Sequence, residues 1–88
     1  MNDAFVRDGQ LVRLPARHRR RRLVLERIAE SFEPGRYFTE PDVNAVLRRW
    51  CAGGDVDHVT VRRYLVDEEL LGRADGKYWR TGGRVDAT

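Results

Sequence analysis

The chain has 88 residues, of which 17 are Lys or Arg and 14 are Asp or Glu, and its formal net charge is +3. A chain of this length buries only about 60–65% of its extended surface, which excludes a large enclosed active site, and no apolar run approaches the ~18 residues of a membrane span. A single cysteine excludes an internal disulfide, and since no export signal is visible we expect one small cytoplasmic domain.

The first predicted element is a β-hairpin over residues 5–12. Short apolar runs flank Asp8-Gly9, and an Asp-Gly pair is typical of a tight two-residue turn because glycine accepts the positive φ required there. Pro15 ends the second strand, and a helix is then predicted from Ala16 to Phe32, before Glu33-Pro34-Gly35. Its apolar face follows the i, i+3, i+4, i+7 spacing and consists of Leu25, Ile28, Ala29 and Phe32.

Two further helices are predicted in the middle of the chain. Thr39 is a suitable N-cap for the first of them, because a proline and two acidic residues follow it in the first turn. Residues 52–54 end that helix, and Asp55 or Asp57 then caps another that runs to about Glu69. The residues expected to face the core are Val43, Val46, Leu47 and Trp50 in the second helix and Val61 and Leu65 in the third.

A second hairpin is predicted at the C-terminal end, with strands at residues 70–74 and 77–80. Asp75-Gly76 forms its turn. Pairing across the turn sets Gly72 opposite Trp79, so the indole is expected to lie over the bare glycine on the core side of the hairpin. The outward face is then expected to carry Leu71, Arg73, Tyr78 and Arg80.

The order of these elements predicts the fold class. Three helices followed by a tight hairpin have the order of a winged helix-turn-helix, in which the third helix reads DNA and the hairpin forms the wing. We therefore predict an α+β, three-helix winged helix-turn-helix-like domain with an N-terminal hairpin over residues 1–80. A flexible tail is expected at residues 81–88.

Four short motifs carry a resemblance to a known family. They are DGxLxxLP at residues 8–15, FEPGRxxTExxVNxxL at 32–47, RRxLVDxxLLxR at 62–73 and YWR at 78–80. Together they resemble an uncharacterised bacterial domain-of-unknown-function family, whose members stand alone or follow arsenic-repressor-type winged-helix regulators. The resemblance implies a small helix-turn-helix-like domain associated with gene regulation, and no activity, ligand or site. The chain departs from the family pattern at Tyr64, where an acid is usual, and at Glu68-Glu69, where a glycine-containing turn is usual.

A run of basic residues occupies the start of the first predicted helix. Residues 1–27 carry eight arginines against three acids, whereas residues 28–76 carry six arginines against ten acids. Cations near the positive end of a helix dipole are unfavourable by roughly 0.3–1 kcal/mol each, and a polyanion lying across them would reverse this cost through counterion release. A solvated, frayed helix end is the other interpretation. The predicted nucleic-acid contacts of this run are Arg17, Arg19, Arg20, Arg21 and Arg22.

The third helix and the wing form a second predicted contact surface. An exposed arc of the helix combines a threonine, an arginine and a tyrosine, which suit guanine, phosphate or a thymine methyl. The same helix ends in Asp67-Glu68-Glu69, which repels DNA and equally suits a basic protein surface or arginines of this chain. In the wing, stacking of Arg73 on Tyr78 is an alternative to a backbone contact. The predicted contacts are Thr60, Arg63 and Tyr64 in the helix and Arg73 and Arg80 in the wing.

Catalytic and metal-binding patterns find little support in the sequence. His18, His58 and Cys51 are isolated, and no Cys-x-x-Cys or His-x-x-x-His spacing occurs. The single serine, Ser31, has no evident base partner. We therefore predict no catalytic residue, no metal, no cofactor and no enzymatic activity, and we expect Cys51 to act as a small buried or half-buried hydrophobe.

These features lead to a functional hypothesis with open alternatives. The leading hypothesis is a small regulatory protein that binds nucleic acid, with duplex DNA preferred, through the first helix, the third helix and the wing. Structured RNA would use the same basic surface. The rival is a protein–protein interaction module of a transcriptional regulator that makes no nucleic-acid contact, which the acidic end of the third helix favours. A homodimer stays open, and no membrane partner is expected.

Overall fold

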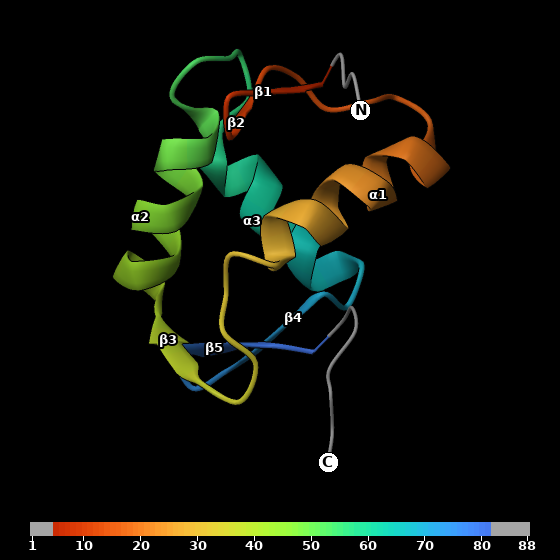
Figure 1. Ribbon diagram of the computed structural model, residues 1–88. Coiled ribbons are helices and arrows are strands. Elements are labelled where there is room, and N and C mark those ends of the chain that lie inside the picture. The colour runs from red at the N-terminus through yellow and green to blue at the C-terminus, as the bar shows by residue number, and fades with distance from the viewer. Residues whose placement is uncertain (1–4, 82–88) are drawn as a thin grey trace.

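The computed structural model describes residues 5–81 and contains three helices, a two-stranded hairpin and a three-stranded sheet. In Figure 1 the first hairpin lies beside the upper ends of α2 and α3, and the sheet lies below the helices. The prediction of an α+β chain is confirmed, whereas the predicted tail lies, apart from Thr81, outside the described residues. The elements are β1 (Val6–Arg7), β2 (Gln10–Leu11), α1 (His18–Ala29), β3 (Tyr37–Thr39), α2 (Glu40–Cys51), α3 (His58–Asp67), β4 (Leu71–Ala74) and β5 (Lys77–Arg80).

Both Asp-Gly turns form as predicted. The two φ angles are 54° and 74° in Asp8-Gly9, and 52° and 75° in Asp75-Gly76. Two consecutive positive φ angles are the mark of the type I′ turn, whose twist matches that of the flanking strands. The register of the second hairpin is also the predicted one, with Gly72 opposite Trp79.

Two helices are shorter than the predicted segments. α1 spans His18–Ala29 rather than Ala16–Phe32, because the chain then tightens into a turn in which the Phe32 N–H donates to the carbonyl three residues earlier at 3.0 Å. Phe32 is nonetheless fully buried, as its spacing predicts. α3 ends at Asp67 rather than Glu69, since Glu69 takes a left-handed φ of 60° that a right-handed helix does not continue.

The start of α2 is fixed by a complete capping box. The Asp42 N–H donates to Thr39 Oγ1 at 3.2 Å, and the Thr39 N–H donates to Asp42 Oδ2 at 3.1 Å. The bond from the Thr39 N–H, followed by the Thr39 side chain, holds the pKa of the Asp42 carboxyl below its ordinary value, because these donors favour the charged form. The predicted N-cap is confirmed, and Glu40 is thereby held at the first position of α2.

β3 is a strand that the sequence patterns did not reveal. It pairs with β5, so the sheet has the order β3-β5-β4, with Tyr37 opposite Trp79. Three residues between a glycine turn and a helix cap are too few to establish an alternating pattern, and only the long-range pairing with β5 makes this segment a strand. Because β3 leads directly into α2, the sheet anchors the start of that helix.

The sheet turns the opposite face to the core from the one predicted. Leu71 and Tyr78 are fully buried, whereas Trp79 is half-buried on the outer face. Trp79 does cover Gly72, since a Cβ at that glycine would overlap the indole. The prediction for Trp79 and Tyr78 was wrong because Tyr78 shares a face of the hairpin with Leu71, which packs into the core, and the Tyr78 hydroxyl finds a partner in Glu40 at 3.1 Å.

The core joins both hairpins and all three helices. Trp50, predicted as a core residue, is half-buried at its edge, where Nε1 donates to Ser31 Oγ at 2.8 Å. Cys51 is half-buried as predicted, and burial raises the pKa of its thiol. The buried apolar side chains are those of Val6, Leu11, Val24, Leu25, Ile28, Ala29, Phe32, Val43, Leu47, Val61, Leu65, Leu70, Leu71 and Tyr78.

Within residues 5–81, no helix has the length and apolar character needed to cross a membrane.

Candidate nucleic-acid interface

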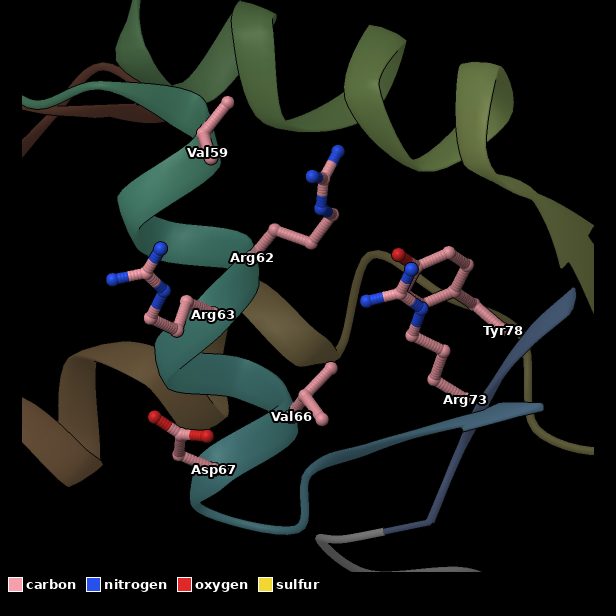
Figure 2. A pocket seen from close by; sticks show the side chains of 7 residues that line it. All are labelled: Val59, Arg62, Arg63, Val66, Asp67, Arg73 and Tyr78. Carbon is pink, nitrogen blue, oxygen red and sulfur yellow. The ribbon is translucent and has the colours of Figure 1, made fainter. Parts of the chain in front are cut away.

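A shallow groove lies between α3 and the hairpin of β4 and β5. Its volume is about 200 Å³. Figure 2 shows Arg62 and Val66 extending into it from α3, while Arg73 and Tyr78 enter from the hairpin. Arg63 extends from the side of α3 that is turned away from the hairpin. The residues that line the groove are Val59, Arg62, Arg63, Val66, Asp67, Arg73 and Tyr78.

Glu40 joins the two sides of this groove. The Tyr78 hydroxyl donates to Glu40 Oε1 at 3.1 Å, and Arg73 Nη2 lies 3.9 Å from the same oxygen. Arg62 Nη1 lies 4.0 Å from Glu40 Oε2 and donates to Asn44 Oδ1 at 2.6 Å. The carboxylate therefore has one hydrogen bond and two loose ion pairs. The side chains of Glu40 and Arg73 are 45% and 57% exposed, so solvent or another anion has access to Arg73, whereas the Arg62 side chain is only 18% exposed.

Tyr78 connects the groove to the core. Its ring is fully buried, while its hydroxyl reaches Glu40. Burial, and then the bond to Glu40, raise the pKa of the phenol above its ordinary value of about 10. The hydroxyl consequently remains a neutral donor over the physiological pH range. Arg73 lies over the ring, with its guanidinium carbon 5.6 Å from the ring centroid.

The arginine run of α1 is divided between internal and exposed side chains. Glu68, just after α3, accepts a hydrogen bond from Arg22 Nη1 at 3.0 Å and lies 2.9 Å from His18 Nε2. The same Arg22 nitrogen donates to the Glu68 backbone carbonyl at 2.9 Å. The bond to Arg22 is the main cause that lowers the pKa of the Glu68 carboxyl, and it raises the pKa of Arg22. One of the three acids that end α3 is thus neutralised by the run itself.

Arg21 and Tyr64 pack against each other in a cation–π contact. The Arg21 guanidinium carbon lies 4.8 Å from the centroid of the Tyr64 ring, and Arg21 Nη1 donates to the Ala16 carbonyl at 3.0 Å. Tyr64 is half-buried, so it does not share the exposure of its neighbours Thr60 and Arg63. The two predicted contacts Arg21 and Tyr64 therefore form a stacked pair between α1 and α3.

The remaining members of the run face solvent. Arg17, Arg19 and Arg20 are exposed, and their side chains have no hydrogen bond or ion pair with any of residues 5–81. In Figure 2 the ribbon of α1 passes behind α3 as the viewer looks into the groove. The structure thus carries two basic surfaces, one in the groove and one at the start of α1.

The groove brings together only part of the predicted set. Arg63 and Arg73 line it, Thr60 is exposed on α3, and Arg80 is half-buried on β5. Arg62 was missed, although its spacing with Val59 and Val66 on the helix indicates a second stripe beside the core face. Glu40 and Asn44 were missed too, and no local pattern points to them because they approach α3 only through the tertiary fold.

No cluster of metal ligands occurs within the described part of the chain. Residues 5–81 contain no group of three or more His, Cys, Asp or Glu side chains placed to hold an ion. The side chains of the groove supply guanidinium donors, a neutral phenol and a carboxylate. Such a set is suited to binding oxyanions through charge-assisted hydrogen bonds.

Comparison with known protein families identifies the family of the chain. The family described as "Uncharacterized protein conserved in bacteria (DUF2087)" matches residues 10–80. The chain belongs to this family. The match covers all three helices and the whole three-stranded sheet, and so includes every residue of the groove in this DUF2087 domain. No curated protein and no solved structure gives a significant match.

Proposed function

We propose that this domain is a winged-helix-like regulatory protein that binds duplex DNA with α3 and the β4-β5 hairpin. The order of elements supports the proposal, because α1, β3, α2 and α3 precede a hairpin whose second strand pairs with β3. In winged helices the third helix enters the major groove and the hairpin contacts the adjacent backbone. Here α3 and the hairpin form the two sides of one groove.

The observation that carries the proposal is the set of three arginines in that groove. Arg62, Arg63 and Arg73 come from the two elements that a winged helix uses for DNA. Guanidinium groups bind phosphate bidentately and are the commonest specific partners of guanine. We assign Arg73 to phosphate, and Arg63 with Thr60 to base edges, because the latter two are exposed on α3.

The acidic groups of the region limit the contact. Asp67 lies on the outer side of α3 together with Arg63, so the phosphate backbone passes on the Arg73 side of the groove. The Glu40 carboxylate lies near both Arg62 and Arg73. A bound phosphate would replace it as the partner of Arg73, whose side chain is 57% exposed, and would turn the Glu40 carboxylate toward solvent.

The exposed arginines of α1 act at longer range in this proposal. Arg17, Arg19 and Arg20 add positive potential on another side of the domain, which raises the rate of encounter with a polyanion without fixing its register. RNA duplexes would feel the same attraction, but side chains cannot read the deep, narrow major groove of A-form RNA.

The decisive test is duplex binding by fluorescence anisotropy between 50 and 200 mM salt. Three to six phosphate contacts predict a slope of log K against log salt of about −3 to −5. Replacement of two exposed groove arginines, R63A/R73A, should weaken binding roughly tenfold or more and reduce the slope by about one, for the phosphate contact of Arg73. The matched control R48A/R49A removes the same charge from exposed positions at the end of α2 and should change binding little.

Three results would contradict the proposal. Equal losses in R63A/R73A and R48A/R49A would mean that net charge alone attracts the DNA. Stronger competition by duplex RNA than by duplex DNA would assign the groove to RNA. Absence of any binding at 50 mM salt, together with retention of a regulatory protein, would favour the alternative of an interaction module.

A further inference from the structure

The outer face of the three-stranded sheet exposes an aromatic pair. Tyr37 on β3 is 66% exposed, and Trp79 lies opposite it on β5. The two rings meet edge to face, with centroids 5.8 Å apart and planes at 77°. Gly72 supports the indole from the neighbouring strand, because its missing side chain leaves room for the ring. Tyr37 therefore packs against an indole that is itself held in place, and most of its own side chain remains exposed to solvent.

Lys77 places a positive charge beside this pair, whereas the Arg36 guanidinium lies over the Phe38 ring, 5.3 Å from its centroid, and 4.0 Å from Glu33. Lys77 Nζ lies 5.7 Å from the centroid of the Tyr37 ring. A hollow of about 140 Å³ beside the rings is lined by Gly35, Arg36, Tyr37, Trp79 and Arg80. This volume is well below the ~300–1,000 Å³ of pockets for drug-sized ligands, so the hollow suits one ring rather than a larger molecule.

The outer face is separate from the groove. Neighbouring residues of a strand point to opposite sides of a sheet, and on β5 Tyr78 points inward to the core while Trp79 lies on the outer face. A ligand on Tyr37 and Trp79 therefore leaves the groove side of the sheet accessible.

We propose that this outer face binds a single-stranded nucleic-acid segment by stacking an unpaired base on Tyr37, with Trp79 beside it and with Lys77 on the adjacent phosphate. An exposed aromatic ring with a cation beside it is the arrangement that binds single strands without sequence readout. Bases inside a duplex are already stacked on their neighbours and cannot stack on a protein side chain such as Tyr37. The inference is independent of duplex binding by the groove.

The charges argue against a second copy of the chain as the occupant. A two-fold dimer brings the same patch of each subunit together. Such a contact would oppose Lys77 with its own counterpart around only two aromatic rings. A nucleic-acid phosphate would instead neutralise the positive charge on this face.

The test uses Trp79 fluorescence. The chain has two tryptophans, so W50F leaves Trp79 as the only indole, and circular dichroism confirms that this variant is folded. Titration with a single-stranded oligothymidylate should quench the emission, and Tyr37→Ala in the same background should weaken binding roughly tenfold. Leu23→Ala, which shortens another exposed side chain on α1, is the matched control and should leave the affinity unchanged.

The outcomes separate this site from the groove. R63A/R73A should bind the oligothymidylate as the parent does, whereas Y37A should bind duplex DNA as the parent does. No quenching at low salt, or equal affinity of Y37A and L23A, would overturn the proposal. Sedimentation showing a dimer that Y37A dissociates would also overturn it, and would assign the face to self-association.

Discussion

Two glutamates, each beside arginines, have different surroundings in this domain. Glu68, at the end of α3, is 15% exposed, and both of its carboxylate oxygens lie within 3.1 Å of Arg22 or His18 nitrogen atoms. Glu40, at the start of α2, is 45% exposed, and its two arginine partners lie 3.9 and 4.0 Å away. We call the Glu68 cluster closed, because its carboxylate is largely buried and fully paired, and the Glu40 cluster open, because its carboxylate is more exposed and its ion pairs are longer.

The difference teaches which arginines are available to a ligand. The arginine-rich start of α1 meets the end of α3 at Glu68, where Arg22 and Glu68 neutralise each other. Arg22 also lies near the negative end of the α3 dipole, which is a favourable position for a cation. In the groove, the arginines outnumber Glu40 and Asp67, and the ion pairs are long. We infer that the Glu68 cluster serves the fold and the Glu40 cluster serves binding.

The largest expected effect on the fold comes from opening the closed cluster. Glu68→Gln removes the charge that Arg22 and His18 share, and leaves both facing the end of α3 without a carboxylate. We expect the Tm to fall by several degrees, measured by circular dichroism. Glu26→Gln is the matched control, because its single i,i+4 pair with Arg22 is more exposed and such pairs contribute little. Equal Tm values for both variants would show that the cluster is not structural.

The pH dependence of stability sharpens the same comparison. The pKa values of Glu68 and Asp42 are lowered in the folded protein, so their contribution to stability is complete above the ordinary carboxyl pKa values of about 4 and is lost as the pH falls through the lowered ones. We expect the free energy of unfolding to decline below about pH 4. Denaturant titrations at several pH values should give a shallower decline for Glu68→Gln, and an unchanged profile would contradict this.

The smallest expected effect concerns the open cluster. Glu40→Gln keeps the acceptor for the Tyr78 hydroxyl but removes the negative charge between Arg62 and Arg73. We expect duplex affinity to rise about threefold at low salt, since one repulsive charge is removed from the contact. The measurement is anisotropy at 50 mM salt, with Glu68→Gln as the comparison. A similar rise in both variants would mean that the position of the charge is unimportant.

Local chemistry made much of the fold predictable. Each Asp-Gly turn, the Thr39 cap and the buried spacing of α1 depend on residues within one or two turns of chain. The face of the final hairpin was mispredicted because Trp79 and Tyr78 are both large, and only the packing of Leu71 decides between them. β3 likewise depends on its partner β5.

The candidate site was predictable only in part. Arg63 and Arg73 follow from position on a helix and a hairpin, and both line the groove. The partition of the arginine run was not predictable, because the contact of Arg22 with Glu68 spans 46 residues of sequence. The approach of Glu40 to Arg62 is equally remote from any local pattern.

The buried ring of Tyr78 has a kinetic consequence. The whole side chain is inaccessible to solvent, with Arg73 over its ring and Glu40 bound to its hydroxyl, so this wall of the groove is preorganised. We therefore expect binding without a slow conformational change of this wall before or during association. Stopped-flow traces should accordingly show a single exponential whose association rate is governed by ionic strength.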